Sequence, residues 1–446
     1  MTHEVYRKKL GADFSGRIPG IFTDEPQLSQ GPNALPWWEG IPGVYAEWND
    51  GRDFWEDLPW LFFDGPEARR IRLLVHRTFL RQFCEAFSKP IYEWCEANKL
   101  EHTGHYNAED AFEGQIRCHC GGIMAHYRYQ QAPGIDHLCR ELDGLILTVK
   151  QVGSAARQLG RKRVLTEIFG VSRHTNTFED FKWLGDYDLV LGANFFCPHL
   201  TWYSMRGRRK RDYPPNWNYQ QTYWDHLKPL NDYFTRLAAA LTMGEGAPDA
   251  LVLHPIETGT SGHRFGFTPP RGVGRTNYQY TVDGRRRALP VDLPGEDMHD
   301  AHWADQLLRR TLESLLNAGF DCDLGDEGYI EDLGSVKDGV FTIGAMSYKL
   351  VVIPPSNTWR PRTFQLLNDF VASGGRVIFA GTLPKELDCI PANEKWQEFA
   401  NLPGVETVPC SAVQIQVAAD RAVKPEILIR SRDGRPMPGF HSQKRI

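Results

Sequence analysis

The sequence predicts an α/β fold in which parallel strands alternate with helices, and two observations carry this prediction. Short apolar runs that end in acidic or polar residues recur through the first half of the chain, with helical stretches between them. Beyond them, fully apolar strands flank long helices. We therefore expect a partial (β/α)8 barrel in residues 1–245, a smaller doubly wound α/β domain in 246–395, and a short β-rich tail in 396–446.

The strands of the first region are short and bounded by turn residues. We expect them within residues 19–24, 100–106, 124–138, 163–170 and 193–202. Helical periodicity covers residues 66–98 (with a break around Pro90), 144–160, 177–192 and 220–242. In barrels of this type the chemistry is found at the carboxyl ends of the strands.

The second region has a different pattern of predicted strands and helices. A strand begins near residue 249, and further strands are expected at 348–355 and 374–381, with helices at 297–318 and 360–373. The strand ends lack the Gly-x-Gly-x-x-Gly fingerprint, so nucleotide binding is not supported. A structural or cleft-closing role is favoured.

Charge and composition exclude several classes of protein. Lys+Arg 51 against Asp+Glu 56 gives a net charge of −5, which argues against a nucleic-acid binder. One basic run, residues 206–211, is interpreted as a solvated loop in preference to a polyanion site. No apolar run has the length of a membrane span, and the first residues show no signal core. The 9 cysteines lack disulfide or zinc spacing, which is typical of a reducing, cytoplasmic compartment.

Reactive side chains follow each predicted strand of the first region. They are Asp24 and Glu25, His105, Asp136, Glu167 and His199. Glycoside hydrolysis needs two carboxyl groups on opposite sides of the scissile bond. Glu25 and Glu167 are the catalytic candidates, because each follows an apolar strand that would aim it into a shared pocket. For a single glutamate, capping of the next helix would be the preferred interpretation.

The remaining residues of this set are candidates for binding the substrate. Successive strand residues face opposite ways, so Asp24 is expected to anchor a loop or to bind a hard cation such as calcium. Sugar rings also need flat apolar faces, and the chain is 12% aromatic. The leading platform candidates lie near the strand ends: Trp37, Trp38, Trp202 and Tyr203.

An ordered set of motifs resembles the family 106 glycoside hydrolases, the α-L-rhamnosidases and their relatives. The motifs are GIFTDEPQ, the stretch from Trp94 to His105, APGID, SAARQLGRKRVLTEIFG and LVVIPP…GGRVIFAG, spread over roughly residues 1–390. The resemblance implies a barrel followed by a domain like the class I amidotransferases. It also implies an inverting mechanism, with Glu25 as general acid and Glu167 as general base, and in some members a calcium ion at the sugar.

This sequence departs from the family pattern in two ways. The strands ending at residues 24 and 167 would be strands four and seven of the barrel, so strands one to three are not found. The family's C-terminal β-sandwich modules are not found either. Two alternatives stay open: a retaining β-galactosidase-like barrel, which has the same strand placement, and a non-catalytic carbohydrate-binding remnant. A carbohydrate is the expected partner in every case.

Overall fold

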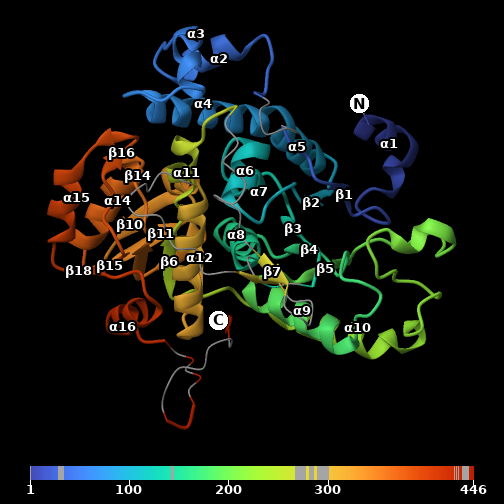
Figure 1. Cartoon of the computed structure of the whole chain (residues 1–446). Helices are drawn as coiled ribbons and strands as arrows, with labels where there is room; N and C mark the ends of the chain where they lie inside the picture. Colours follow the sequence, from blue (N-terminus) through green and yellow to red (C-terminus); the bar gives the residue numbers. More distant parts are fainter. Residues whose placement is uncertain are drawn as a thin grey trace.

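The structure is a computed structural model of the chain (Figure 1). It describes residues 2–28, 35–140, 142, 145–266, 301–425, 427, 429, 431–433 and 441–446, and the backbone of 278–280 and 286–288. Within this described part of the chain, no helix combines the length and the apolar character needed to cross a membrane.

The first region holds parallel strands that lie side by side in chain order. β1 (Gly20–Thr23) pairs with β2 (Glu101–Gly104), and β3 (Gly134–His137), β4 (Leu165–Ile168) and β5 (Phe195–Pro198) form a second parallel group. The Ala132 amide donates to the His102 carbonyl oxygen at 3.2 Å, which places β2 beside β3. All carboxyl ends therefore meet at one edge, as predicted.

Helices connect these strands and cover them. Those longer than one turn are α1 (Thr2–Leu10), α2 (Ile41–Trp48), α4 (Ala68–Phe83), α5 (Lys89–Ala97), α6 (Phe112–His119), α8 (Leu145–Gln158), α9 (Phe178–Leu191) and α10 (Leu227–Thr242). Shorter turns are η1 (Gly11–Asp13), α3 (Phe54–Asp57), η2 (Leu58–Leu61), α7 (Met124–Tyr127), η4 (Gly207–Arg211) and η5 (Trp224–His226).

Two local predictions in this region were wrong. The helix does not end at the break expected around Pro90. A π-helical turn, η3 (Cys84–Ser88), joins α4 to α5 directly before Pro90, whose ring nitrogen cannot donate the usual i→i−4 hydrogen bond. The strand expected over 124–138 is only β3, because its first residues form α7, which packs on α8.

The second region is a parallel sheet in the order β18-β15-β13-β6-β9. Its strands are β6 (Ala250–Leu253), β9 (Cys322–Gly325), β13 (Leu350–Ile353), β15 (Arg376–Ala380) and β18 (Val405–Val408). Helices on both faces are α11 (Ile256–Gly262), α12 (Ala301–Asn317), α13 (Glu327–Leu333), α14 (Pro361–Ala372), α15 (Asn393–Ala400) and α16 (Ala412–Ala422). Such a sheet is doubly wound.

Short strands complete this region. β10 (Gly334–Lys337), β11 (Val340–Ile343) and β12 (Met346–Tyr348) form an antiparallel sheet; β14 (Thr358–Trp359), β16 (Glu386–Leu387) and β17 (Ile390–Pro391) form another; and β7 (Tyr278–Tyr280) pairs with β8 (Arg286–Ala288). The tail expected as short strands instead contains α16, because Ile415, Ala418 and Ala419 recur at helical spacing and are buried as the helix packs on α12.

A continuous apolar core joins the two regions. It runs from α6 and α8 to both faces of the second sheet, and α8 is buried along almost its whole length between β3 and β9. The two basic side chains of α8, Lys150 and Arg157, reach the Asp321 carboxylate at 3.3 and 2.9 Å. Burial of these charges is tolerated because each is paired.

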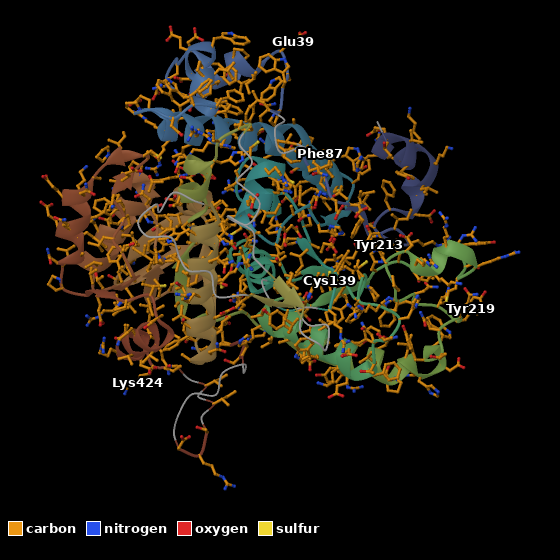
Figure 2. All side chains as sticks on the ribbon, viewed as in Figure 1. Glu39, Phe87, Cys139, Tyr213, Tyr219 and Lys424 are labelled. Atoms are coloured by element: carbon orange, nitrogen blue, oxygen red, sulfur yellow. The ribbon has the colours of Figure 1, made fainter. Side chains whose placement is uncertain are left out.

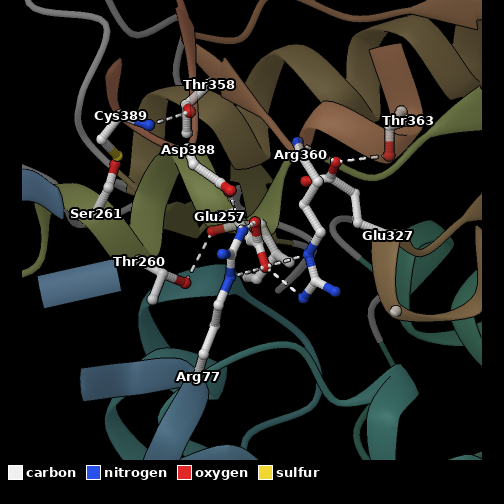
Figure 3. Close-up of polar contacts among 12 residues, drawn as sticks. Arg77, Glu257, Thr260, Ser261, Glu327, Thr358, Arg360, Thr363, Asp388 and Cys389 are labelled. Atoms are coloured by element: carbon white, nitrogen blue, oxygen red, sulfur yellow. Dashed lines mark hydrogen bonds and ion pairs between the residues drawn. The ribbon is translucent and has the colours of Figure 1, made fainter. Parts of the chain in front are cut away.

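A buried ionic cluster also crosses between the regions, and Figure 3 shows Arg77 and Arg360 converging on Glu257. We call Arg77, Glu257, Arg360 and Asp388 the arginine-filled cluster. Arg77 lies on α4, whereas Glu257 opens α11 after β6. Burial alone would raise the pKa of Glu257, but the charges of Arg360 and Arg77 outweigh it and hold that pKa well below its usual range.

Asp388 joins this cluster from a tight hairpin. β16 and β17 are antiparallel and are connected by Asp388 and Cys389, both with positive φ (49° and 59°). Positive φ at both central residues is typical of a type I′ turn. The turn carries the Asp388 carboxylate to within 2.7 Å of Arg77, while Glu386 on β16 pairs with Arg69 of the same helix α4. The hairpin therefore holds α4 against the second region through these two ion pairs.

Candidate active site

The parallel register places the acidic residues of β3 and β4 next to each other. Asp136 pairs with Glu167, and Glu167 pairs with Cys197 on β5. Paired residues of neighbouring strands project from the same face. In both β3 and β4 the acid is the only position that is not fully buried. The local sequences Gly-Ile-Asp-His and Leu-Thr-Glu-Ile thus direct one carboxyl group each toward solvent and bury the apolar residues around it.

His105 links three strand ends. Its Nε2 lies 2.6 Å from Glu167 Oε2 and 3.4 Å from Asp24 Oδ1. His199, after β5, has its Nε2 3.9 Å from Glu167 Oε1. Both histidines are almost completely buried, whereas the Asp24 side chain is 77% exposed. We call Asp24, His105, Asp136, Glu167 and His199, together with Glu25, the strand-end cluster.

Glu25 lies at the open edge of this cluster. Its backbone has φ 45°, in the left-handed region that a glutamate rarely adopts. Such a conformation costs free energy and persists only where the surrounding structure imposes it. The Glu25 side chain is exposed, and its charge acts on the Asp136 carboxyl group. Glu25 therefore belongs electrostatically to the same site as its neighbour Asp24.

In the strand-end cluster, burial and the negative charges of neighbouring carboxylates raise the pKa of Asp136. Burial raises the pKa of Asp136 to about 7, and the positive charge of His105 opposes that rise. The nearby carboxylates of Glu167, Glu25 and Asp24 add to it. Among the described residues, Asp136 Oδ1 is buried and has no hydrogen-bond partner. Asp136 is thus a carboxyl group that carries a proton for much of the time near neutral pH.

His105 is held in its charged form. Burial by itself lowers the pKa of His105, but the hydrogen bond to Glu167 and the charges of Glu109 and Asp136 outweigh burial and raise that pKa to about 9. Below pH 9 an imidazolium therefore faces the Glu167 side chain at the end of β4. The strand-end cluster thus places the positive charge of His105 beside the proton-bearing carboxyl group of Asp136.

Sequence reasoning missed Glu109, which lies behind the site. This fully buried side chain accepts hydrogen bonds from the Tyr106 amide at 2.9 Å, the Tyr127 hydroxyl at 3.1 Å and the Asp136 amide at 3.0 Å. Burial raises its pKa to about 8. Glu109 ties the loop after β2 to β3 and so fixes Asp136. Its position in the polar segment that follows β2 was the available signal.

Three side chains of the cluster could hold a metal ion. Asp24, His105 and Glu167 offer ligand atoms that all lie within 4.8 Å of one another. Calcium takes oxygen ligands, whereas a set with imidazole suits a divalent transition metal better. Ligation would also require a neutral His105. The donor set therefore fits calcium only through its two carboxylates.

The four predicted aromatic platforms occupy different surroundings. Trp37 is half-exposed and contacts Phe54 and Trp55, and Trp38 packs on Phe79. Trp38, Phe54 and Phe79 belong to an apolar cluster built by α2, α3 and α4.

The other two lie after β5, on the loop that follows His199. The Trp202 ring is buried and contacts His174, whereas Tyr203 is 96% exposed. On the same loop, the ring of Tyr213 lies 5.5 Å from that of His199. Tyr213 is therefore in ring contact with the strand-end cluster, as is Phe22 of β1, whose ring lies 5.5 Å from that of His105. Sequence reasoning singled out neither residue.

Solved structures of glycoside hydrolases share this fold. The chain superposes on a rhamnosidase from Novosphingobium sp. PP1Y with TM-score 0.66 and 16% identity, covering 98% of this chain and 40% of that one. A β-galactosidase from Rahnella sp. R3 matches with TM-score 0.56 and 12% identity, over 86% and 54%. A β-galactosidase from the haloarchaeon Halorubrum lacusprofundi matches with TM-score 0.52 and 10% identity, over 88% and 58%.

These similarities establish the fold at low sequence identity. No protein-family model matches the chain, and no curated protein matches it. The chain spans about 40% to 58% of the length of these three solved structures. The architecture is thus the α/β arrangement found in rhamnosidase and β-galactosidase structures.

Proposed function

We propose that this chain is the catalytic part of a glycoside hydrolase that removes a terminal sugar, with an α-L-rhamnoside as the favoured substrate. The observation that carries the proposal is the strand-end cluster, in which Glu167 is ion-paired with His105 beside the proton-bearing Asp136. The fold similarity to a rhamnosidase supports the choice of sugar. Membership of family 106 is part of the same proposal.

In the proposed mechanism Glu25 and Glu167 divide the acid and base roles. Glu167 accepts a proton from water as the water oxygen attacks the anomeric carbon, and Glu25 donates a proton to the departing glycosidic oxygen. The products are a free sugar of inverted configuration and an alcohol. Asp136, His199 and the aromatic candidates Trp37, Trp38, Trp202 and Tyr203 would bind the sugar. Calcium, where bound, would be held by carboxylates such as Asp24 and would orient sugar hydroxyls.

The architecture proposed for this function follows the sequence prediction. Residues 1–245 would be strands four to eight of a (β/α)8 barrel, residues 246–395 a domain like the class I amidotransferases, and residues 396–446 a terminal segment. The doubly wound order of the second sheet supports the middle assignment.

Turnover of nitrophenyl glycosides by the whole chain tests the proposal. Hydrolysis of the α-L-rhamnoside in preference to the β-D-galactoside is expected, and proton NMR of the first-formed sugar should show inversion. A retained anomer with the galactoside preferred would establish the retaining β-galactosidase-like alternative. Absence of turnover with every glycoside, combined with measurable sugar binding, would establish the carbohydrate-binding remnant.

A further inference from the structure

The most concentrated positive charge in the described chain lies between β5 and α10. We call residues 206–211 the basic loop; it contains the turn η4, and its side chains are exposed. Within the described residues, none of its five cationic side chains forms an ion pair: Arg206, Arg208, Arg209, Lys210 and Arg211. Like charges crowded on a short turn repel one another, and the chain as a whole is acidic, with a net charge of −5.

The basic loop is held in place by the segment that follows β4. His174 Nε2 lies 2.6 Å from the carbonyl oxygen of Lys210, and the Ser172 amide donates to the carbonyl oxygen of Pro214 at 2.9 Å. Arg173, between these two residues, adds another exposed positive charge. These hydrogen bonds hold the backbone of the basic loop in place. Its long cationic side chains extend into solvent, where an anion can contact them.

The segment that follows the basic loop contacts the strand-end cluster. Tyr213, two residues beyond Arg211, contacts His199, and His199 Nε2 lies 3.9 Å from Glu167 Oε1. Figure 2 shows Tyr213 and Tyr219 on this segment, at the end of the molecule remote from the second sheet. The chain segment that carries these cations therefore continues, within two residues, into a contact with the strand-end cluster.

We propose that the basic loop is a subsite for the carboxylate or sulfate groups of an acidic oligosaccharide, next to the sugar that the strand-end cluster cleaves. This inference rests on the proposed function and narrows its substrate class. The strand-end cluster repels anionic groups and the loop attracts them, so the two together would orient the saccharide. Arginine suits this task because its planar fork binds carboxylate and sulfate oxygens in pairs.

Calorimetric titration of the whole protein tests the subsite with two matched pairs of probes. One pair is hexagalacturonate and its neutral methyl ester, and the other is a dextran sulfate hexasaccharide and dextran of the same length. The charged member of at least one pair should bind about tenfold more tightly than its neutral partner, since a few exposed ion pairs are worth this much. The pair with the larger ratio identifies carboxylate or sulfate as the natural group.

A variant and a matched control locate the effect. The triple substitution Arg208→Gln, Arg209→Gln and Lys210→Gln should weaken binding of the charged probe about tenfold, with an unchanged melting temperature. A control that removes the same charge from exposed sites of the second region, Lys337→Gln, Lys349→Gln and Lys395→Gln, should retain binding.

Three results would overturn the subsite. They are equal binding of charged and neutral probes, equal weakening in the loop variant and its control, and loop-dependent binding of a short DNA duplex that exceeds both saccharides. Failure of the proposed function gives a different signature. In that case loop-dependent binding of the acidic saccharide persists, while no nitrophenyl glycoside is hydrolysed.

Discussion

Both regions of the molecule hold a cluster of acidic residues near the carboxyl ends of parallel strands, but the negative charges of the two clusters are neutralised to different extents. In the arginine-filled cluster, Glu257 is only 9% exposed and two guanidinium groups compensate its charge. In the strand-end cluster several carboxyl groups share the single imidazolium of His105, and Asp24 is 77% exposed. Acidic residues at the carboxyl ends of strands therefore do not by themselves make a reaction site. An uncompensated charge that solvent can reach distinguishes the strand-end cluster.

The largest expected effect concerns catalysis in the strand-end cluster. Glu167→Gln and Glu25→Gln should each lower turnover by about 10²- to 10⁴-fold with the fold retained, because the amide keeps the shape of the side chain. A nitrophenyl leaving group should partly rescue Glu25→Gln, and azide should rescue only Glu167→Gln. Glu406→Gln, at an exposed ion pair on β18, is the control. Near-normal turnover in either variant would remove that residue from the mechanism.

The next effect is expected on stability, in the arginine-filled cluster. Glu257→Gln should lower the free energy of unfolding by about 3 kcal/mol, because Arg77 and Arg360 are left facing each other without a counter-charge. Urea unfolding measures this. Asp332→Asn removes an exposed ion pair with Arg128 and should cost less than about 1 kcal/mol. An equally small loss of stability in Glu257→Gln and Asp332→Asn would show that the arginine-filled cluster does not depend on its buried counter-charge.

A smaller effect is expected from the pH dependence of stability at Asp136. Its folded-state pKa of about 7 lies above its ordinary value of 3.8, so its stabilising contribution is present at low pH and is lost as pH rises through 7. The free energy of unfolding of the wild type should therefore fall between about pH 4 and 7, by up to about 1.4 kcal/mol per pH unit from this group. Asp136→Asn should lack this part of the decline. An identical slope in both proteins would contradict the assignment.

The smallest effect is expected where α4 meets α11 beside the arginine-filled cluster. His76 Nε2 lies 3.2 Å from His263 Nδ1. Burial, together with the charges of Arg72 and Arg117, lowers the pKa of His263 to about 4. A depressed histidine pKa gives stability that is present above pH 6.5 and is lost as pH falls toward 4.

The test of this pair is the acid dependence of urea unfolding. His263→Phe should flatten the loss of stability between pH 6.5 and 4 by up to about 1.4 kcal/mol per pH unit, since the unfolded chain then binds one proton fewer. His226→Phe, at an exposed histidine of η5, should leave the slope unchanged. A steeper slope in His263→Phe would show that the pair is not neutral in the folded protein.

The sequence was sufficient to predict the strand ends of the first region and the presence of a second parallel sheet. Alternation of strand and helix implies parallel strands, and parallel strands bring their carboxyl ends together. His105, Asp136, Glu167 and His199 could be placed on one edge for that reason. The roles of Glu25 and Glu167 as acid and base stay predictions.

Contacts between distant segments could not be predicted. Arg77 and Glu257 are 180 residues apart, and no local pattern marks them as partners. Glu109 bonds to β3 only because the loop after β2 folds back over it. The packing of Trp38 on Phe79 likewise depends on where α4 lies. Local periodicity predicts elements and their direction, whereas these partners are decided by how the elements pack.

The π-helical turn between α4 and α5 has a consequence for how the chain tolerates changes in length. A π turn holds one more residue than an α turn, and each helical residue advances the side chains by about 100°. The extra residue lets α4 present Arg77 to the second region while α5 buries Cys95 on the other side. Deleting one residue from Cys84–Ser88 would regularise the helix but rotate α5 by about a quarter turn. This segment should therefore tolerate substitutions more readily than insertions or deletions.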